Sequence, residues 1–136
     1  MEDKFSWYLA GFFDGEGNVS IRIKPDPRYK TGYAVKLRIE LTQKNKGVLE
    51  LIKKRIGMGY IYPKQKGIWS LCIWSKKDIN KFVSIVYTKT FVKHKELSRL
   101  KDCLKILDAK KHLNNKGISK LQNMLQTGRE SEDNTI

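Results

Sequence analysis

The sequence has few cysteines, few acidic residues and no long apolar run. Its two cysteines, Cys72 and Cys103, stand far apart among apolar neighbours, which excludes a disulfide framework and a zinc site and predicts buried, reduced thiols. No apolar run approaches the ~20 residues that a membrane-spanning helix requires. The acidic and aromatic opening residues do not form a secretory signal. These absences predict a soluble, intracellular protein without a membrane partner.

Basic residues outnumber the acidic ones, and this is the strongest feature of the composition. The chain carries 28 Lys and Arg against 14 Asp and Glu, a formal charge of +14 over 136 residues. Such a charge destabilises a compact monomer by self-repulsion, so a polyanionic partner is favoured. Nucleic acid is the preferred partner. A solvated basic surface and an anionic membrane surface are the alternatives.

Apolar residues follow helical and strand periodicities in turn along the chain. Spacings of three and four predict helices over 5–13, 47–56, 76–86, 93–107 and 118–125. Alternation predicts strands near 19–23, 35–41, 58–62 and 68–74. This order predicts an α+β fold with four antiparallel strands and helices on one face. We expect one domain over residues 1–126 and a polar, flexible tail over 127–136.

A short motif spans the end of the first predicted helix, where segment 9–17 reads Leu-Ala-Gly-Phe-Phe-Asp-Gly-Glu-Gly. It resembles the signature of the LAGLIDADG homing endonucleases. The basic-faced hairpin and the segment Thr42-Gln43-Lys44 that follow strengthen the resemblance, which covers residues from about 5 to 107. It implies the αββαββα core of that family, in which a four-stranded antiparallel saddle binds DNA and the helices lie on the opposite face.

Two glycines stand four residues apart in this motif. Glycine within a helix costs about 1 kcal/mol relative to alanine, so Gly11 and Gly15 require an explanation. One explanation is a core helix of a single domain; the other is close contact with a partner helix. The resemblance implies the second and, because the chain has one copy of the motif, a two-fold homodimer. Its interface would consist of Tyr8, Gly11, Phe12 and Gly15.

The eighth residue of the motif is Glu16, and the resemblance assigns to it the role of catalytic, metal-binding acid. Pairing of two chains would bring two copies of Glu16 together, and their repulsion calls for cations between them. The backbone carbonyl of Gly15 is a further expected ligand. Oxygen ligands suit Mg²⁺; we expect Mn²⁺ to serve as well and Ca²⁺ to bind without supporting cleavage. Asp14 is the competing carboxylate, and by resemblance it caps or supports the paired helices.

Two further residues match the surroundings of the family's active site. Gln43 matches the polar residue that orients the attacking water. Lys95 matches the basic residue near the scissile phosphate, where a positive charge stabilises the developing negative charge. Lys93 is a near-equal rival to Lys95, because few anchors fix the register there.

The sequence departs from the family's pattern at one position. A relative carries Arg where this chain has Gly47. Lys44 or Lys46 therefore takes the role of that Arg, or the role is missing.

The expected DNA-reading surface is formed by the polar faces of the two hairpins. A two-stranded ribbon fits the major groove, where Arg and Lys favour guanine edges and Glu can accept from cytosine. In the first hairpin and its loop the expected contacts are Ser20, Arg22, Lys24, Arg28, Lys30, Lys36, Arg38, Glu40 and Thr42. Elsewhere they are Lys44, Tyr60, Tyr62, Lys64, Lys66, Trp69 and Lys93. Alternation leaves open whether Trp69 or Trp74 faces the DNA.

The resemblance implies a homodimeric, site-specific homing endonuclease. It would make a double-strand break in a long pseudo-palindromic site of double-stranded DNA by Mg²⁺-dependent phosphodiester hydrolysis. Such an enzyme serves intron homing, in the cytoplasm or in the organelle that holds the host intron gene. The alternatives of the same fold are an RNA-splicing maturase, which would bind RNA, and a non-cleaving nucleic-acid-binding regulator. The presence of Glu16 and Gln43 argues against the maturase, because a protein that does not cleave has no need of this acid.

Overall fold

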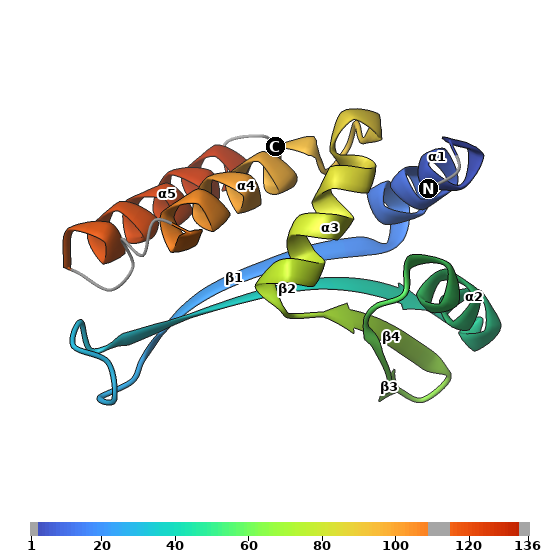
Figure 1. The fold of residues 1–136 in the computed structure, drawn as a ribbon, viewed down its shortest axis with the longest axis horizontal. Helices are drawn as coiled ribbons and strands as arrows, with labels where there is room; N and C mark the ends of the chain where they lie inside the picture. The colour runs from blue at the N-terminus through green and yellow to red at the C-terminus, as the bar shows by residue number, and fades with distance from the viewer. Residues whose placement is uncertain (1–2, 109–114, 134–136) are drawn as a thin grey trace. The chain divides into compact units, whose positions relative to one another are not determined.

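The computed structural model of the protein describes residues 3–108 and 115–133 (Figure 1). Its elements, in chain order, are α1 (Asp3–Glu16), β1 (Gly17–Pro25), β2 (Tyr33–Gln43), α2 (Lys46–Ile56), β3 (Tyr60–Gln65), β4 (Ile68–Ile73), α3 (Lys76–Val86), the 3-10 helix η1 (Tyr87–Lys89), α4 (His94–Asp108) and α5 (Asn115–Asp133). The strands form one sheet in the order β1-β2-β4-β3, with β4 antiparallel to both of its neighbours. The predicted α+β fold class and the αββαββα order of elements are confirmed.

The ends of the helices differ most from the prediction. Helix α1 runs through Glu16, so this acid is the last helical residue and does not follow the helix. Gly15 keeps a helical backbone and therefore does not cap α1. Helix α5 reaches Asp133 and includes most of the segment expected to be a tail, while residues 134–136 lie outside the described residues. No helix in the described ranges combines the length and apolar composition that crossing a membrane requires.

The chain forms two compact units, which are built from interleaved parts of the sequence. Unit 1 comprises Met1–Ser20 and Leu37–Ser98. Unit 2 comprises Ile21–Lys36 and Arg99–Ile136. In unit 1, α1 packs against α3, and the Phe13 and Phe82 rings meet edge-on with their centroids 5.4 Å apart. In unit 2, Leu100 and Leu121 are fully buried. Cys72 of unit 1 and Cys103 of unit 2 are buried free thiols, as predicted.

The strands of unit 1 turn different residues to their two faces. Leu41 of β2 lies opposite Leu71 of β4, and both are fully buried on the side against which α2 packs. Trp69 pairs with Gln43 and falls on this covered side. The alternate residues form the other side, which we call the polar sheet face: Arg38, Glu40, Thr42, Tyr60, Tyr62, Lys64, Ser70 and Cys72.

Gly17 allows the chain to pass from α1 into β1. A Cβ atom at this position would lie 2.2 Å from the Phe13 ring and 2.6 Å from the Phe13 carbonyl oxygen, so packing within the chain requires glycine here. Gly11 and Gly15 differ, because in the part of the chain that the structure describes, nothing beyond the neighbouring backbone of α1 lies within 4 Å of a Cβ atom at either position. Packing within the chain therefore does not explain these two glycines.

We expect Gly17→Ala to lower the free energy of unfolding by about 1–3 kcal/mol, because the added methyl group overlaps the Phe13 ring and carbonyl. Gly11→Ala is the matched control, and it should raise the free energy of unfolding by up to about 1 kcal/mol, since alanine stabilises an exposed helical position. Urea denaturation at a concentration that keeps the chain monomeric measures both changes. An unfolding midpoint of Gly17→Ala equal to that of the wild type would contradict this description of the packing.

Candidate active site

Glu16 ends α1 with its side chain exposed to solvent. Among the described residues, none donates a hydrogen bond to its carboxylate and none forms an ion pair with it. In the same part of the chain, no three His, Cys, Asp or Glu side chains come together. Both oxygens of Glu16 are therefore open to a cation or a proton donor from outside the chain.

One side of α1 is largely exposed, and two of its residues are glycines without side chains. Tyr8, Gly11, Phe12 and Gly15 lie along this side at helical spacing, and we call them the α1 strip. Both glycines and Tyr8 are exposed, Phe12 is half-buried, and the Tyr8 and Phe12 rings lie 6.1 Å apart. The opposite side of α1 is buried in unit 1. The α1 strip thus offers a surface that another helix can approach closely, and Glu16 follows directly after it.

Asp14 is bound within the chain, in contrast to Glu16. Its carboxylate accepts hydrogen bonds from the backbone N–H groups of Phe91, at 2.8 Å, and Lys93, at 3.1 Å. In return, the Lys93 ammonium donates to the Asp14 carbonyl oxygen at 2.7 Å. Each carboxylate oxygen of Asp14 therefore has a donor. These bonds fix the segment before α4 to the last turn of α1, and the expectation that Asp14 caps or supports the paired helices stays a prediction.

The two candidate lysines lie in different surroundings. The bond to the Asp14 carbonyl holds the Lys93 ammonium at the end of α1, two residues before Glu16. Lys95 is exposed in the first turn of α4, and no described residue pairs with it. A contact therefore fixes Lys93 near the candidate acid, whereas Lys95 is free to move toward a phosphate group.

Gln43 ends β2, at the same end of the β1–β2 hairpin as the start of β1 (Figure 1). Its side-chain oxygen accepts hydrogen bonds from the backbone N–H groups of Lys44, at 2.8 Å, and Asn45, at 3.5 Å. The amide nitrogen is then the group that remains to donate. Of the two lysines near Gly47, Lys46 pairs with Glu50 at 3.8 Å. Lys44 is exposed and has no partner among the described residues.

Glu40 is buried at the centre of the polar sheet face, with 5% of its surface exposed. Its carboxylate accepts a hydrogen bond from the Lys64 ammonium at 2.6 Å and lies 3.9 Å from the Arg38 guanidinium. Burial alone would raise the pKa of Glu40, but hydrogen bonds from Lys64 and Ser70 and the charges of Lys64 and Arg38 outweigh it and lower this pKa. The prediction that Glu40 reads a base is therefore wrong for this geometry: the carboxylate holds two cations in place.

Trp74, and not Trp69, joins the polar sheet face. The Trp74 ring packs against Tyr60 and Tyr62, with centroid distances of 5.2 and 5.5 Å. Trp69 is half-buried on the opposite side, where the Lys46 ammonium lies 4.3 Å from its ring centroid. Trp74 follows the last paired residue of β4 and continues the alternation of Ser70 and Cys72 on this face.

In unit 2, the long loop of the first hairpin is organised by one acid. Asp26 accepts three side-chain hydrogen bonds from the Arg28 guanidinium, at 3.0, 3.2 and 2.7 Å, and also accepts the Arg28 backbone N–H. The Arg28 hydrogen bonds lower the pKa of Asp26 to about 2. Arg28 is thus already paired, although it is exposed.

The other predicted DNA contacts with exposed side chains are Arg22, Lys24, Lys30, Lys36, Lys44, Tyr60, Tyr62, Lys64 and Lys66, and the half-buried ones are Ser20, Arg38, Thr42, Trp69 and Lys93.

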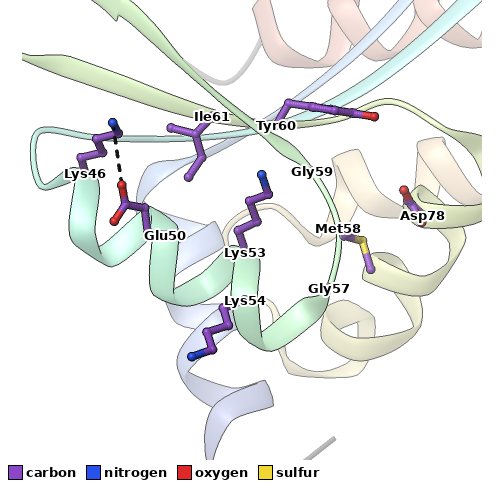
Figure 2. Close-up of a pocket in the computed structure, with 10 residues that line it drawn as sticks. All are labelled: Lys46, Glu50, Lys53, Lys54, Gly57, Met58, Gly59, Tyr60, Ile61 and Asp78. Carbon is purple, nitrogen blue, oxygen red and sulfur yellow. Dashed lines mark ion pairs between the residues drawn. The ribbon is translucent and has the colours of Figure 1, made fainter.

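A pocket of about 770 Å³ lies in unit 1 beside β3 (Figure 2). Lys53 points from α2 across this pocket toward Tyr60, whereas Lys54 points away from it. Lys46 and Glu50 also line the pocket and form the ion pair drawn in Figure 2. The residues that line the pocket include none of the predicted catalytic residues.

The motif and the elements that follow it match a known protein family. A model of the LAGLIDADG endonuclease family matches residues 9–107. The chain belongs to this family. The matched range begins at Leu9, the first residue of the motif, and contains Glu16, Gln43 and Lys95.

Individual LAGLIDADG proteins resemble the chain over different shares of their length. The DNA endonuclease I-CreI of Chlamydomonas reinhardtii is 38% identical over 60 residues, which are 43% of this chain and 37% of I-CreI. The meganuclease I-CpaMI, solved bound to uncleaved DNA, is 28% identical with a TM-score of 0.80, over 88% of this chain and 42% of I-CpaMI. The archaeal intron-encoded I-Vdi141I, solved in complex with DNA, is 26% identical with a TM-score of 0.82, over 91% of this chain and 81% of I-Vdi141I. The chain thus spans less than half of the first two proteins.

We expect Asp14→Ala to release the segment before α4, because the backbone N–H groups of Phe91 and Lys93 lose their acceptors. The free energy of unfolding should fall by about 1–3 kcal/mol. Hydrogen exchange of these two amides, followed by NMR, should become faster. Glu50→Ala is the matched control, since its exposed i,i+4 pair with Lys46 is worth only about 0.3–0.5 kcal/mol. Unchanged exchange at both amides would contradict the role of Asp14.

Proposed function

We propose that the protein is a homodimeric, site-specific DNA endonuclease that cuts both strands of a long pseudo-palindromic site by divalent-metal-dependent phosphodiester hydrolysis. The observation that carries this proposal is the position of Glu16, an exposed carboxylate without a partner among the described residues, at the end of a helix whose exposed side carries two glycines. Membership of the LAGLIDADG family supports it. So do the DNA complexes of I-CpaMI and I-Vdi141I.

Pairing of two chains through the α1 strip would explain why positions 11 and 15 are glycine, whereas packing within one chain does not explain it. Two helices approach most closely where neither carries a side chain, and a two-fold axis at the α1 strip would place two copies of Glu16 side by side. The match over 88% of this chain but 42% of I-CpaMI fits the idea that two copies together do what one longer chain does.

The residues at the end of α1 suit a hard divalent cation. The Glu16 carboxylate and the Gly15 carbonyl of each chain are oxygen donors, which Mg²⁺ and Mn²⁺ prefer, and we expect Ca²⁺ to bind there without supporting cleavage. A cation bound there would supply positive charge for the scissile phosphate and would make a bound water more acidic. The single chain contributes one unpaired carboxylate to such a site, so the other ligands would come from the second chain and the DNA.

Other side chains of the site would position the reacting groups. The Gln43 amide nitrogen, left free by the bonds to its oxygen, can donate to the attacking water or to a phosphate oxygen. Lys95, or Lys93 if it leaves the Asp14 carbonyl, can stabilise negative charge at the scissile phosphate. Lys44, which is exposed and has no partner among the described residues, is our candidate for the role that Gly47 leaves open.

We expect Glu16→Gln to lower the rate of double-strand cleavage by at least about a thousandfold, because it removes the charge of a ligand that each chain supplies to the reaction. The target is first isolated by selecting a randomised duplex library for cleavage by the wild type in Mg²⁺. Affinity for that duplex, measured without Mg²⁺, should change little. Glu50→Gln, at an exposed acid paired with Lys46, is the matched control and should cleave normally. Normal cleavage by Glu16→Gln, or no cleavage of any duplex by the wild type, would overturn the proposal.

We expect Gly11→Ala to weaken self-association by about tenfold or more, because a methyl group at a close helix contact overpacks it from both chains. The same variant should not lose stability as a monomer, since its site is open within the chain. Sedimentation velocity across a concentration series measures the association. Asn80→Ala, at an exposed position of α3, is the control. A wild-type protein that stays monomeric at micromolar concentration, with and without its DNA, would reject the homodimer.

A further inference from the structure

Three aromatic side chains meet at the outer edge of the polar sheet face. Tyr60 and Tyr62 lie on the edge strand β3, and Trp74 packs against both of them. Their exposed fractions are 59%, 40% and 43%, so each keeps a large apolar surface in solvent. We call them the aromatic patch. Exposed apolar side chains that gather at one place mark a binding surface more often than isolated ones do.

The surroundings of the aromatic patch point to a polyanionic partner. The Lys53 ammonium lies 6.0 Å from the centroid of the Tyr60 ring, and Figure 2 draws Lys53 pointing toward it. On the side of β2, the Lys64 ammonium is held by Glu40. Because Glu40 itself is buried, it offers no exposed acceptor to a ligand at this place. The aromatic patch thus combines apolar surface with lysines beside it.

The major groove of duplex DNA offers one apolar group, the C5-methyl of thymine. Base edges that hydrogen-bond would lose water against the ring carbons, and they would gain partners only at the two tyrosine hydroxyls and the Trp74 indole N–H. The spacing also fits. Tyr60 and Tyr62 are two strand residues apart, or about 6.6 Å, and two base steps along a DNA strand are about 6.8 Å.

We propose that the aromatic patch contacts thymine methyl groups over about three consecutive base pairs of the DNA site, and that it thereby selects thymine there. The inference rests on the proposed function, because it concerns the same DNA-facing side of the sheet. The packing of the Trp74 ring against both tyrosine rings favours duplex DNA over unpaired bases. The Trp74 ring is tilted by 30° and 50° against the two tyrosine rings, and these contacts take up part of the ring surface on which an unpaired base would stack.

The test uses the duplex selected from a randomised library by binding to the wild type. Each thymine of that duplex is replaced singly by deoxyuridine, which lacks only the methyl group, and affinities are measured by fluorescence anisotropy. For the wild type, the replacement should weaken binding about fourfold per contacted methyl at neighbouring positions. In Trp74→Ala and in Tyr60→Ala this loss should disappear. Trp69→Ala, on the opposite side of the sheet, should keep it.

Thermal melting of each variant checks folding, and the strongly exposed Tyr60 gives a variant with little effect on the core. In one outcome, the wild type binds duplex DNA, and every deoxyuridine replacement lowers its affinity no more than it lowers the affinity of Trp74→Ala and Tyr60→Ala. In that case the inference fails and the proposed function stands. If the wild type prefers the single strand of the selected sequence, the aromatic patch stacks on unpaired bases and the inference is again overturned. If no duplex binds at all, the proposed function fails together with it.

Discussion

The carboxylate of Asp14 ties the last turn of α1 to the segment that precedes α4, and the arrangement of the candidate site depends on this tie. The residues that it joins are 77 and 79 positions apart in the sequence. It uses both oxygens of one acid and the ammonium of Lys93, and it leaves Glu16 as the open carboxylate two residues later. Two acids of one motif thus have opposite tasks: one stabilises the fold and the other remains available to a cation.

Several features of the site could be predicted from the sequence because they depend on local patterns. Alternation and helical spacing gave the order of the elements, and the motif gave Glu16 and the exposed side of α1. The burial of Glu40 could not be predicted, because it depends on Lys64, which lies 24 residues away on another strand. The side of Trp74 follows from alternation only once the core side of β4 is known, and the packing of Leu71 beside Leu41 of β2 decides that side. Contacts between strands decide what alternation within a strand leaves open.

The basic residues of the sheet and its loop are not equivalent, although they contribute equally to the formal charge. Arg28 is held by Asp26 and Lys64 by Glu40, whereas Lys44 and Lys95 have no partner among the described residues. A cation that is held in place loses less conformational entropy on binding, so it can favour one geometry of the DNA. An unpaired lysine adapts to any nearby phosphate, and phosphate contacts carry no sequence information directly. We therefore expect the basic residues that are paired with acids to orient the DNA, and the unpaired lysines to contribute attraction to its phosphates.

The two open glycines of α1 have a consequence for anyone who would engineer this protein. Each occupies a helical position where a larger residue meets no obstacle within the chain. A screen that scores only the thermal stability of the isolated chain would favour replacing both of them. Such a screen would fill the surface through which we propose that the chains recognise each other, and the most heat-resistant variants would be those least able to assemble.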